Sequence, residues 1–150
     1  MPIFATHKKA RFDYEILERL EAGLVLTGAE VKSIRQGSAK LDGSFVMVRG
    51  RGATIVNMHI GAYPYATNPH YIPDATRKLL LSAKEINYLR GKTEEKGLTI
   101  VPLSLYTKGT LIKLEIGIAK GKKIHDKRRT IKEREGKRSL QRMLKHGRDD

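Results

Sequence analysis

The sequence predicts a mainly β fold, a small antiparallel barrel that carries helices at its rim, followed by a basic C-terminal tail. Two apolar segments, residues 98–106 and 111–119, flank a short turn and form the strongest hairpin pattern in the chain. Roughly six short segments have strand character and are separated by turn residues, whereas only two or three have helical spacing. The last 31 residues hold few apolar side chains and many cations. They are therefore predicted to lie outside the barrel.

Residues 14–26 have an ambiguous pattern. Their first half places apolar side chains at helical spacing, but their second half, AGLVL, has strand character. Gly23 lies within this second half and suggests a bulge or bend in a sheet. We therefore expect strands that are broken near residues 21–23.

Residues 28–37 predict one short helix. Val31 and Ile34 lie three positions apart and form an apolar face, and a glycine suits the C-terminal end. Lys32 and Arg35 share a face that points away from this apolar pair. The helix is thus expected to display two cations to solvent.

The middle of the chain predicts three further strands. Residues 45–48 and 54–60 are expected to pair around a turn that is rich in Arg and Gly. Residues 79–81, three consecutive leucines, are typical of a short buried strand. Between these strands, residues 63–74 are rich in Pro, Tyr, Asn and His and are expected to form a loop.

A second helix is predicted after the leucines. Ser82 and Glu85 have the spacing of a capping box, in which each side chain accepts from the other residue's backbone N–H. The helix is expected to end by Gly97.

The hairpin of residues 98–119 is expected to bury one face and expose the other. Lys113 and Glu115 alternate with three apolar side chains, which is the pattern of a half-buried strand. Pro102 has no N–H to donate to a central ladder, so we expect it at an edge or a bulge.

Residues 120–150 carry 13 Lys and Arg against 5 Asp and Glu, a net charge of +8 within a total of +14. A segment with so few apolar residues cannot offset the entropy that it would lose on ordering. We therefore predict two domains, a barrel of residues 1–119 with rim helices and a tail of residues 120–150 that is disordered when free. Nucleic acid is the polyanion expected to order it.

The composition excludes several kinds of site. The chain has no Cys, so disulfides and thiolate metal sites cannot form. Its five His residues lack the close spacing of an imidazole metal site, and neither a nucleophile motif nor a phosphate-binding loop is present. The composition does not exclude a hydrolytic pair of carboxylates among Glu21, Glu30, Asp42 and Asp74, although no pattern marks any two of them as neighbours. We expect no metal, no cofactor and no catalysis.

The N-terminal residues lack the apolar core of a secretory signal, and no stretch approaches the length of a membrane span. We therefore expect a cytoplasmic protein that does not contact membranes.

Basic clusters are the remaining candidates for function. They are residues 7–11, the Lys32 and Arg35 helix face, residues 77–78, and the tail. One such cluster is usually only a solvated surface, but several in a chain of this charge favour phosphate contacts. If roughly six to ten phosphates are neutralised, affinity should fall by about three to five decades between about 50 and 200 mM salt.

Residues 28–35, GAEVKSIR, match the pattern G-[ST]-E-V-K-S-[IL]-R except that Ala29 replaces Ser or Thr. Four further blocks follow the same family order, at residues 21–23, 77–81, 97–103 and 119–128. The resemblance extends over nearly the whole chain from residue 8 to residue 134. The chain therefore resembles the SsrA-binding protein family (small protein B), the bacterial partner of transfer-messenger RNA.

This resemblance implies a fold and a function. The fold is an oligonucleotide-binding-type barrel with flanking helices. The function is to bind the tRNA-like domain of transfer-messenger RNA and to deliver it to stalled ribosomes, where translation resumes on the RNA's own tag-coding frame. The tail is implied to occupy the vacant decoding site of the small subunit and the mRNA channel, where it becomes helical. The protein performs no chemistry in this scheme, and we expect a monomer.

The resemblance also assigns residues to RNA binding. Glu21, Leu80 and the basic pair Lys8 and Lys9 fall on family positions implicated in RNA binding, and His7 stands where the family usually has Asn. A carboxylate such as Glu21 can accept from base N–H groups or hold a neighbouring cation. The complete predicted RNA-binding set is His7, Lys8, Lys9, Glu21, Lys32, Arg35, Lys78 and Leu80.

A second set matches the ribosome-engaging motif of the family's tail. It consists of Gly121, Lys122, Lys123, His125, Asp126, Lys127 and Arg128. The ring of His125 is expected to stack on a base of the decoding site.

Two other hypotheses are weighed against this one. A ribosomal or rRNA-chaperone barrel, anchored in rRNA by its basic tail, would also explain the charge, and would co-purify with whole subunits rather than with one small RNA. An RNA-modifying or RNA-cleaving enzyme would turn over RNA, but no acid–base or metal motif supports it.

Overall fold

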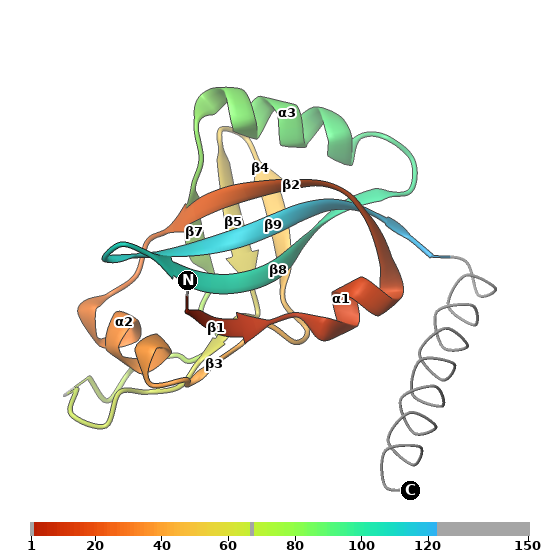
Figure 1. The fold of residues 1–150 in the computed structure, drawn as a ribbon. Coiled ribbons are helices and arrows are strands. Elements are labelled where there is room, and N and C mark those ends of the chain that lie inside the picture. The colour runs from red at the N-terminus through yellow and green to blue at the C-terminus, as the bar shows by residue number, and fades with distance from the viewer. Residues whose placement is uncertain (1, 67, 123–150) are drawn as a thin grey trace, which may run out of the picture.

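The computed structural model describes residues 2–66 and 68–122 (Figure 1). Most of the predicted tail, from residue 123 onwards, lies outside the described residues, and so do the predictions of its disorder and of its helix on the ribosome. The division into two domains therefore stays a prediction.

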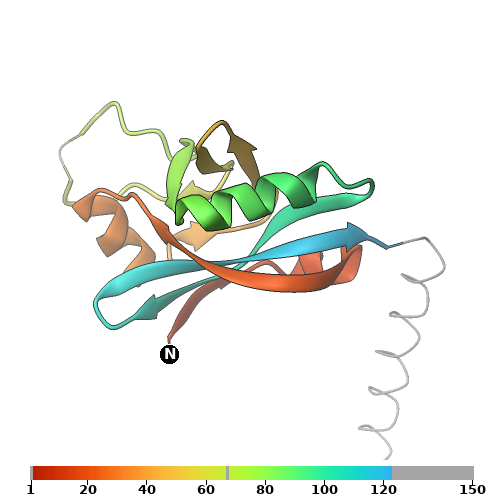
Figure 2. The same cartoon turned by 90° about the horizontal axis from the view of Figure 1, so that it is seen from above.

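Seven antiparallel strands form one curled sheet in the order β1-β8-β9-β2-β7-β5-β4 (Figures 1 and 2). The strands are β1 (Ile3–Thr6), β2 (Tyr14–Leu24), β4 (Phe45–Arg49), β5 (Gly52–Val56), β7 (Arg77–Leu80), β8 (Leu98–Lys108) and β9 (Leu111–Gly121). Two short strands, β3 (Ala39–Lys40) and β6 (His59–Ile60), pair in a separate sheet. The predicted antiparallel, barrel-like fold is confirmed, and the barrel is open.

Within residues 2–66 and 68–122, three helices lie at the rim of the barrel: α1 (Lys8–Asp13), α2 (Gly28–Arg35) and α3 (Ala83–Thr93). Helix α3 lies along one side of the barrel, where it contacts β4 and β8, whereas α1 and α2 lie apart from each other, near opposite ends of β2 (Figures 1 and 2). Capping boxes begin both longer helices, Thr27 with Glu30 in α2 and Ser82 with Glu85 in α3. The two predicted helices are confirmed, whereas α1 was not predicted.

The barrel encloses one main apolar core, to which the sheet and the helices contribute. Ile34 of α2 and Leu89 of α3 are fully buried in it. The largest buried side chains from the sheet are Ile55, Leu79, Ile100, Leu105, Leu114, Ile116 and Ile118. Burial of this apolar surface is the main force that holds the rim helices on the sheet.

The break predicted in the first long strand is wrong. β2 runs unbroken through residues 21–23, and its register shifts earlier, between Ile16 and Glu18. Gly23 stays in register with its partners on both sides. A Cβ there would lie only 3.0 Å from Cβ of Leu80, so the glycine allows a close approach of β7 rather than a bulge.

The strand predicted for residues 54–60 is two strands. β5 ends at Val56, and Asn57 follows with a φ of 64°. This left-handed conformation is one that Asn tolerates better than most residues, and it redirects the chain. His59 and Ile60 then pair with β3 instead of β4.

The leucine strand is only partly buried. Leu79 is in the core, but Leu80 is 53% exposed, because successive side chains of a strand point to opposite faces. The prediction of a buried run is therefore wrong for Leu80, which lies on the outer face of β7 together with Lys78.

The strongest predicted hairpin is confirmed by β8 and β9. Ile112, Leu114 and Ile116 are buried, while Lys113 and Glu115 are partly exposed on the other face. The register shifts between residues 102 and 104, so Pro102 stands at a bulge, as expected.

Candidate RNA-binding surface

The outer face of the sheet carries one continuous row of residues across five strands. Leu80 of β7 pairs with Gly23 of β2, and Gly23 pairs with Lys113 of β9. Lys113 pairs in turn with Tyr106 of β8, and Tyr106 with Ile3 of β1. Residues directly opposite each other in antiparallel strands share a face. Leu80 and Lys113 therefore lie on either side of a glycine, where the surface has no intervening side chain.

Glu21 lies on the same face, two residues before Gly23. The Tyr106 hydroxyl donates a hydrogen bond to Oε2 of Glu21, and the Lys108 ammonium lies 3.4 Å from Oε1. Of the two roles expected for this carboxylate, holding a neighbouring cation is thus present in the structure. The carboxylate is partly exposed, with 35% of its side chain accessible, so it can also meet a ligand.

The protonation states of this pair are well defined. The Tyr106 hydrogen bond is the largest influence on the pKa of Glu21, and with the Lys108 cation it lowers that pKa against the effect of desolvation. Burial, followed by the hydrogen bond to Glu21, raises the pKa of Tyr106. At neutral pH the hydroxyl is therefore a donor and the carboxylate is an acceptor only.

Helix α2 places its two cations at the same end of the sheet. Nη2 of Arg35 donates to the carbonyl of Thr110, at the tip of the β8–β9 hairpin, over 3.2 Å. The Lys32 ammonium lies 5.5 Å from the centre of the Tyr63 ring. Arg35 thus contacts Thr110, and Thr110 lies only two residues after Lys108, the partner of Glu21. Helix α2 and the three residues Glu21, Tyr106 and Lys108 therefore form one region. We call Glu21, Leu80, Lys108, Lys113 and the two α2 cations the sheet-end surface.

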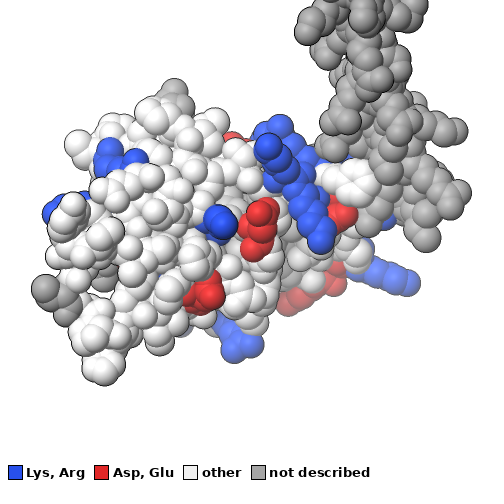
Figure 3. Space-filling model, turned by 90° about the horizontal axis from the view of Figure 1, so that it is seen from below, with Lys and Arg blue, Asp and Glu red and all other residues white. Residues whose placement is uncertain are grey.

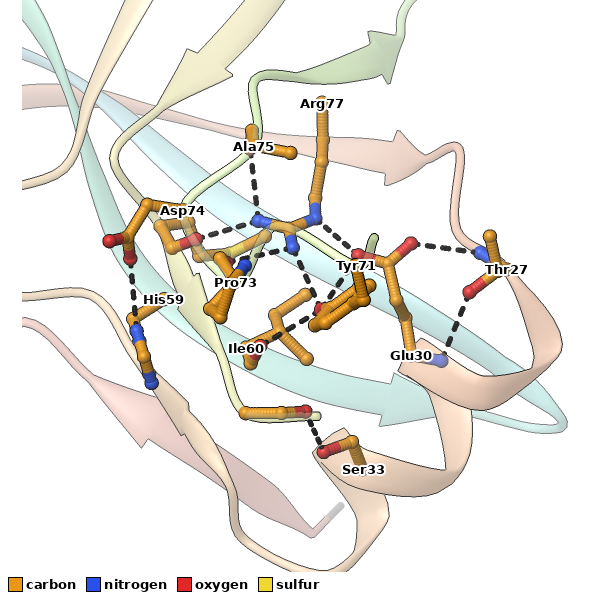
Figure 4. Close-up of polar contacts among 12 residues, drawn as sticks. Thr27, Glu30, Ser33, His59, Ile60, Tyr71, Pro73, Asp74, Ala75 and Arg77 are labelled. Atoms are coloured by element: carbon orange, nitrogen blue, oxygen red, sulfur yellow. Dashed lines mark hydrogen bonds and ion pairs between the residues drawn. The ribbon is translucent and has the colours of Figure 1, made fainter. Parts of the chain in front are cut away.

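A buried arginine holds α2 in this position (Figure 4). Nε of Arg77 donates to Oε2 of Glu30 over 2.6 Å, and Glu30 also caps the helix by accepting from the backbone N–H of Thr27. Arg77 is 4% exposed and Glu30 7%. The remaining Arg77 hydrogen bonds go to the carbonyls of Met58, Pro73 and Ala75 and to the Tyr71 hydroxyl. All five N–H donors of the guanidinium are therefore used inside the protein.

This network corrects one prediction from the sequence. The basic cluster of Arg77 and Lys78 was expected to contact phosphates, but only Lys78 is on the surface. Burial raises the pKa of the Glu30 carboxyl, yet the hydrogen bonds from Thr27 and Arg77 outweigh it, so the pKa of Glu30 lies below its ordinary value. The pair is thus ionised at neutral pH, and it is structural.

The predicted N-terminal cluster lies at the opposite end of β2. His7 is 7% exposed, its Nδ1 lies 2.9 Å from the Pro102 carbonyl, and its backbone N–H donates to the Leu103 carbonyl. Its ring therefore anchors the start of α1 instead of facing solvent. Lys8 and Lys9 are exposed on α1, and their contact with RNA stays a prediction.

Two residues of the predicted ribosome-engaging set are described, and both lie beside α1. Gly121 pairs with Tyr14 at the end of β9. The backbone N–H of Lys122 donates to the Asp13 carbonyl, and its ammonium donates to the Arg11 carbonyl. Lys123, His125, Asp126, Lys127 and Arg128 lie outside the described residues.

The predicted RNA-binding residues thus fall into two regions. Tyr14 and Glu21 are seven residues apart on β2, which corresponds to roughly 23 Å at about 3.3 Å per residue. Seen from below, the Lys and Arg side chains gather mainly in the right half of the view (Figure 3). Sequence reasoning placed all these residues in one set because it could not separate the two ends of a long strand.

Tyr106, Lys108 and Lys113 were missed as candidate site residues. The alternation of β9 already indicates that Lys113 faces outwards, but only the register shows which residues stand opposite it. Tyr106 lies in an apolar run and is 8% exposed, so its pattern is that of a core residue.

The described part of the chain contains no group of three His, Cys, Asp or Glu side chains that could hold a metal ion. Glu21, Glu30 and Asp74, three of the candidate carboxylates, pair with Lys108, Arg77 and His59 respectively. Among the described residues, none of the helices combines the length and apolar character that crossing a lipid bilayer requires.

Comparisons with known proteins show which family this chain belongs to. A family model described as SmpB protein matches residues 4–146. The SsrA-binding protein of Acaryochloris marina is 49% identical over 97% of this chain and 95% of its own length, and that of Magnetococcus marinus 50% identical over 95% of each.

A chain in a solved structure described as "tmRNA-SmpB: a journey to the center of the bacterial ribosome" is 42% identical. It aligns with a TM-score of 0.66 and covers 79% of this chain and 84% of its own length. A family match over nearly the whole sequence, with relatives close to half identical, establishes that this chain belongs to the SmpB family.

Proposed function

We propose that this protein binds the tRNA-like domain of transfer-messenger RNA and brings the RNA to stalled ribosomes for trans-translation. The observation that carries the proposal is its 42% identity to the SmpB chain of a tmRNA-SmpB ribosome structure, over most of both chains. The name of its relatives, SsrA-binding protein, supports the same RNA partner.

The sheet-end surface is the RNA contact in this proposal. Lys108, Lys113 and the two α2 cations neutralise phosphates, and such contacts fix position without reading sequence. Glu21 is ionised and can only accept, so it selects base or ribose groups that donate. Leu80 is half exposed beside Gly23, and it offers an apolar contact to the face of a base or a sugar.

A second contact region lies at the other end of β2. Lys8 and Lys9 belong to α1, and the last turn of this helix accepts hydrogen bonds from Lys122, near the start of residues 120–150. In the proposal these residues enter the vacant decoding site and mRNA channel of the small subunit. The protein catalyses no step itself and acts as a monomer in the cytoplasm, where stalled ribosomes are found.

A gel-shift titration against the tRNA-like domain tests the proposal. The full chain should prefer this RNA to an unrelated duplex of equal length, and log K should fall linearly with log salt. Each phosphate-contacting cation that is replaced by Met should reduce the salt slope by about 1. Equal affinity for the two RNAs would contradict the proposed partner, because charge alone would then explain the binding.

A further inference from the structure

A pocket of about 190 Å³ lies between the first turn of α2 and the loop that follows β6. Its walls include Thr27, Ala29 and Glu30 on the helix side and Tyr63, Ala66 and Tyr71 on the loop side. A cavity of about 150 Å³ holds one benzene ring, whereas pockets for drug-sized ligands begin at about 300 Å³. The pocket therefore has room for one small aromatic ring system and for little more.

The walls of the pocket suit an aromatic ring. Two are tyrosines, and alanines and a glycine keep the space between them open. Polar groups in its walls already have partners: Glu30 accepts from Thr27 and Arg77, the Tyr71 hydroxyl donates to the Ile60 carbonyl, and Oδ1 of Asn68 accepts from the His70 N–H. The pocket thus offers aromatic and apolar surface instead of a binding site for an ion.

Cations lie on both sides of the pocket. On one side the Lys32 ammonium is 5.5 Å from the centre of the Tyr63 ring. On the other side a shallower hollow shares Thr27, Glu30 and Tyr71 with the pocket and extends to Lys78. An RNA nucleotide has one aromatic base with a phosphate on each side along its strand. The ring-sized pocket suits the base, and the two cations suit the phosphates on either side of it.

We propose that the pocket binds one unpaired nucleobase of the RNA held by this protein, with the flanking phosphates at Lys32 and Lys78. RNA is recognised largely through unstacked bases that pack on aromatic side chains, and the tyrosine walls provide this contact. The inference rests on the proposed function and adds to it a site for a single unpaired base, which the sheet-end surface does not supply.

Filling the pocket tests the inference without removing a polar contact. Ala29→Leu places a larger side chain in its wall, and Ala83→Leu, in the first turn of α3, is the matched control. The tRNA-like domain is made with 2-aminopurine at each unpaired position in turn. The full chain should change the fluorescence at one position. Ala29→Leu should abolish that change and weaken binding by about 5- to 100-fold, as expected for the loss of one base–aromatic contact, while Ala83→Leu should do neither.

Thermal unfolding of each variant shows whether it is folded. If Ala29→Leu does not fold, Ala66→Leu fills the pocket from the loop side and replaces it. The inference is overturned if a folded, filled variant binds the RNA as the unmodified chain does, or if the fluorescence change persists. Failure of the unmodified chain to prefer this RNA would instead overturn the proposed function, so the two failures are distinguishable.

Discussion

Replacement of Arg77 by Met should unfold the protein at much lower denaturant concentration. The change removes a guanidinium that is 4% exposed and makes five hydrogen bonds. It leaves the Glu30 carboxylate, which is 7% exposed, without its cation, and it removes a donor from three backbone carbonyls, of which that of Pro73 still accepts from the Ile60 N–H. A hydrophobic side chain of similar length fills the space but cannot satisfy these groups.

The size of the effect follows from the burial of the pair. Removing one partner of a buried ion pair destabilises a protein by about 3–5 kcal/mol, because the other charge stays buried and uncompensated. The total stability of a domain is about 5–15 kcal/mol, so this is a large share. With an m-value of about 2 kcal/mol/M, the urea midpoint should fall by roughly 2 M.

Urea unfolding followed by circular dichroism measures this shift. Lys78→Met is the matched control, since Lys78 is the next residue but points to solvent, and it should change stability by no more than about 0.5 kcal/mol. Glu30→Gln and the double variant complete a cycle that isolates the interaction of the pair. A loss below about 1 kcal/mol for Arg77→Met would refute the structural role assigned to the network.

Three further predictions follow from the same contacts. The pKa of Glu30 is lower in the folded chain than its ordinary value, so the ionised carboxylate stabilises the fold above about pH 4.5, and this stabilisation is lost as the pH falls through the folded pKa. The difference in urea midpoint between the unmodified chain and Glu30→Gln should therefore shrink in acid. Tyr106→Phe removes the hydrogen bond that holds the Glu21 carboxylate in place, so it should weaken RNA binding by about 5- to 10-fold in a gel shift. In a Glu21→Ala background the same change should have little further effect, and equal effects in both backgrounds would contradict the role of the hydroxyl. Truncation after Lys122 keeps all of β9 and should leave affinity for the tRNA-like domain within about threefold while abolishing tagging on stalled ribosomes; a parallel loss of both would argue against the proposed division of labour.

Local sequence patterns predicted much of the fold. The β8–β9 hairpin follows from alternation on both sides of a turn, and α3 follows from the capping box of Ser82. Each of these depends on residues that are close in the sequence. Asn57 marks where such reasoning failed, because one left-handed residue splits an apparently continuous strand and sends its second part to another sheet.

The site needed contacts that are distant in the sequence. Arg77 has the pattern of a surface cation, and only its pairing with Glu30, 47 residues away, shows that it is buried. Tyr106 and Glu21 are 85 residues apart, so no local pattern joins them. His7 was assigned by resemblance to a family position, but its ring packs against the backbone of β8. In each case long-range pairing decides which polar side chains remain on the surface.

The central claim is that the sheet-end surface grips the RNA, and a pair of charge-matched variants tests it most directly. Glu21→Ala and Glu94→Ala each remove one exposed carboxylate, but Glu94 is the C-cap of α3 and belongs to neither proposed contact region. Both changes raise the net charge equally, so nonspecific attraction to RNA rises equally. In binding titrations with the tRNA-like domain, Glu21→Ala should weaken affinity about tenfold or more, whereas Glu94→Ala should leave it unchanged or slightly stronger. If Glu21→Ala binds as tightly as Glu94→Ala, the RNA does not contact this surface.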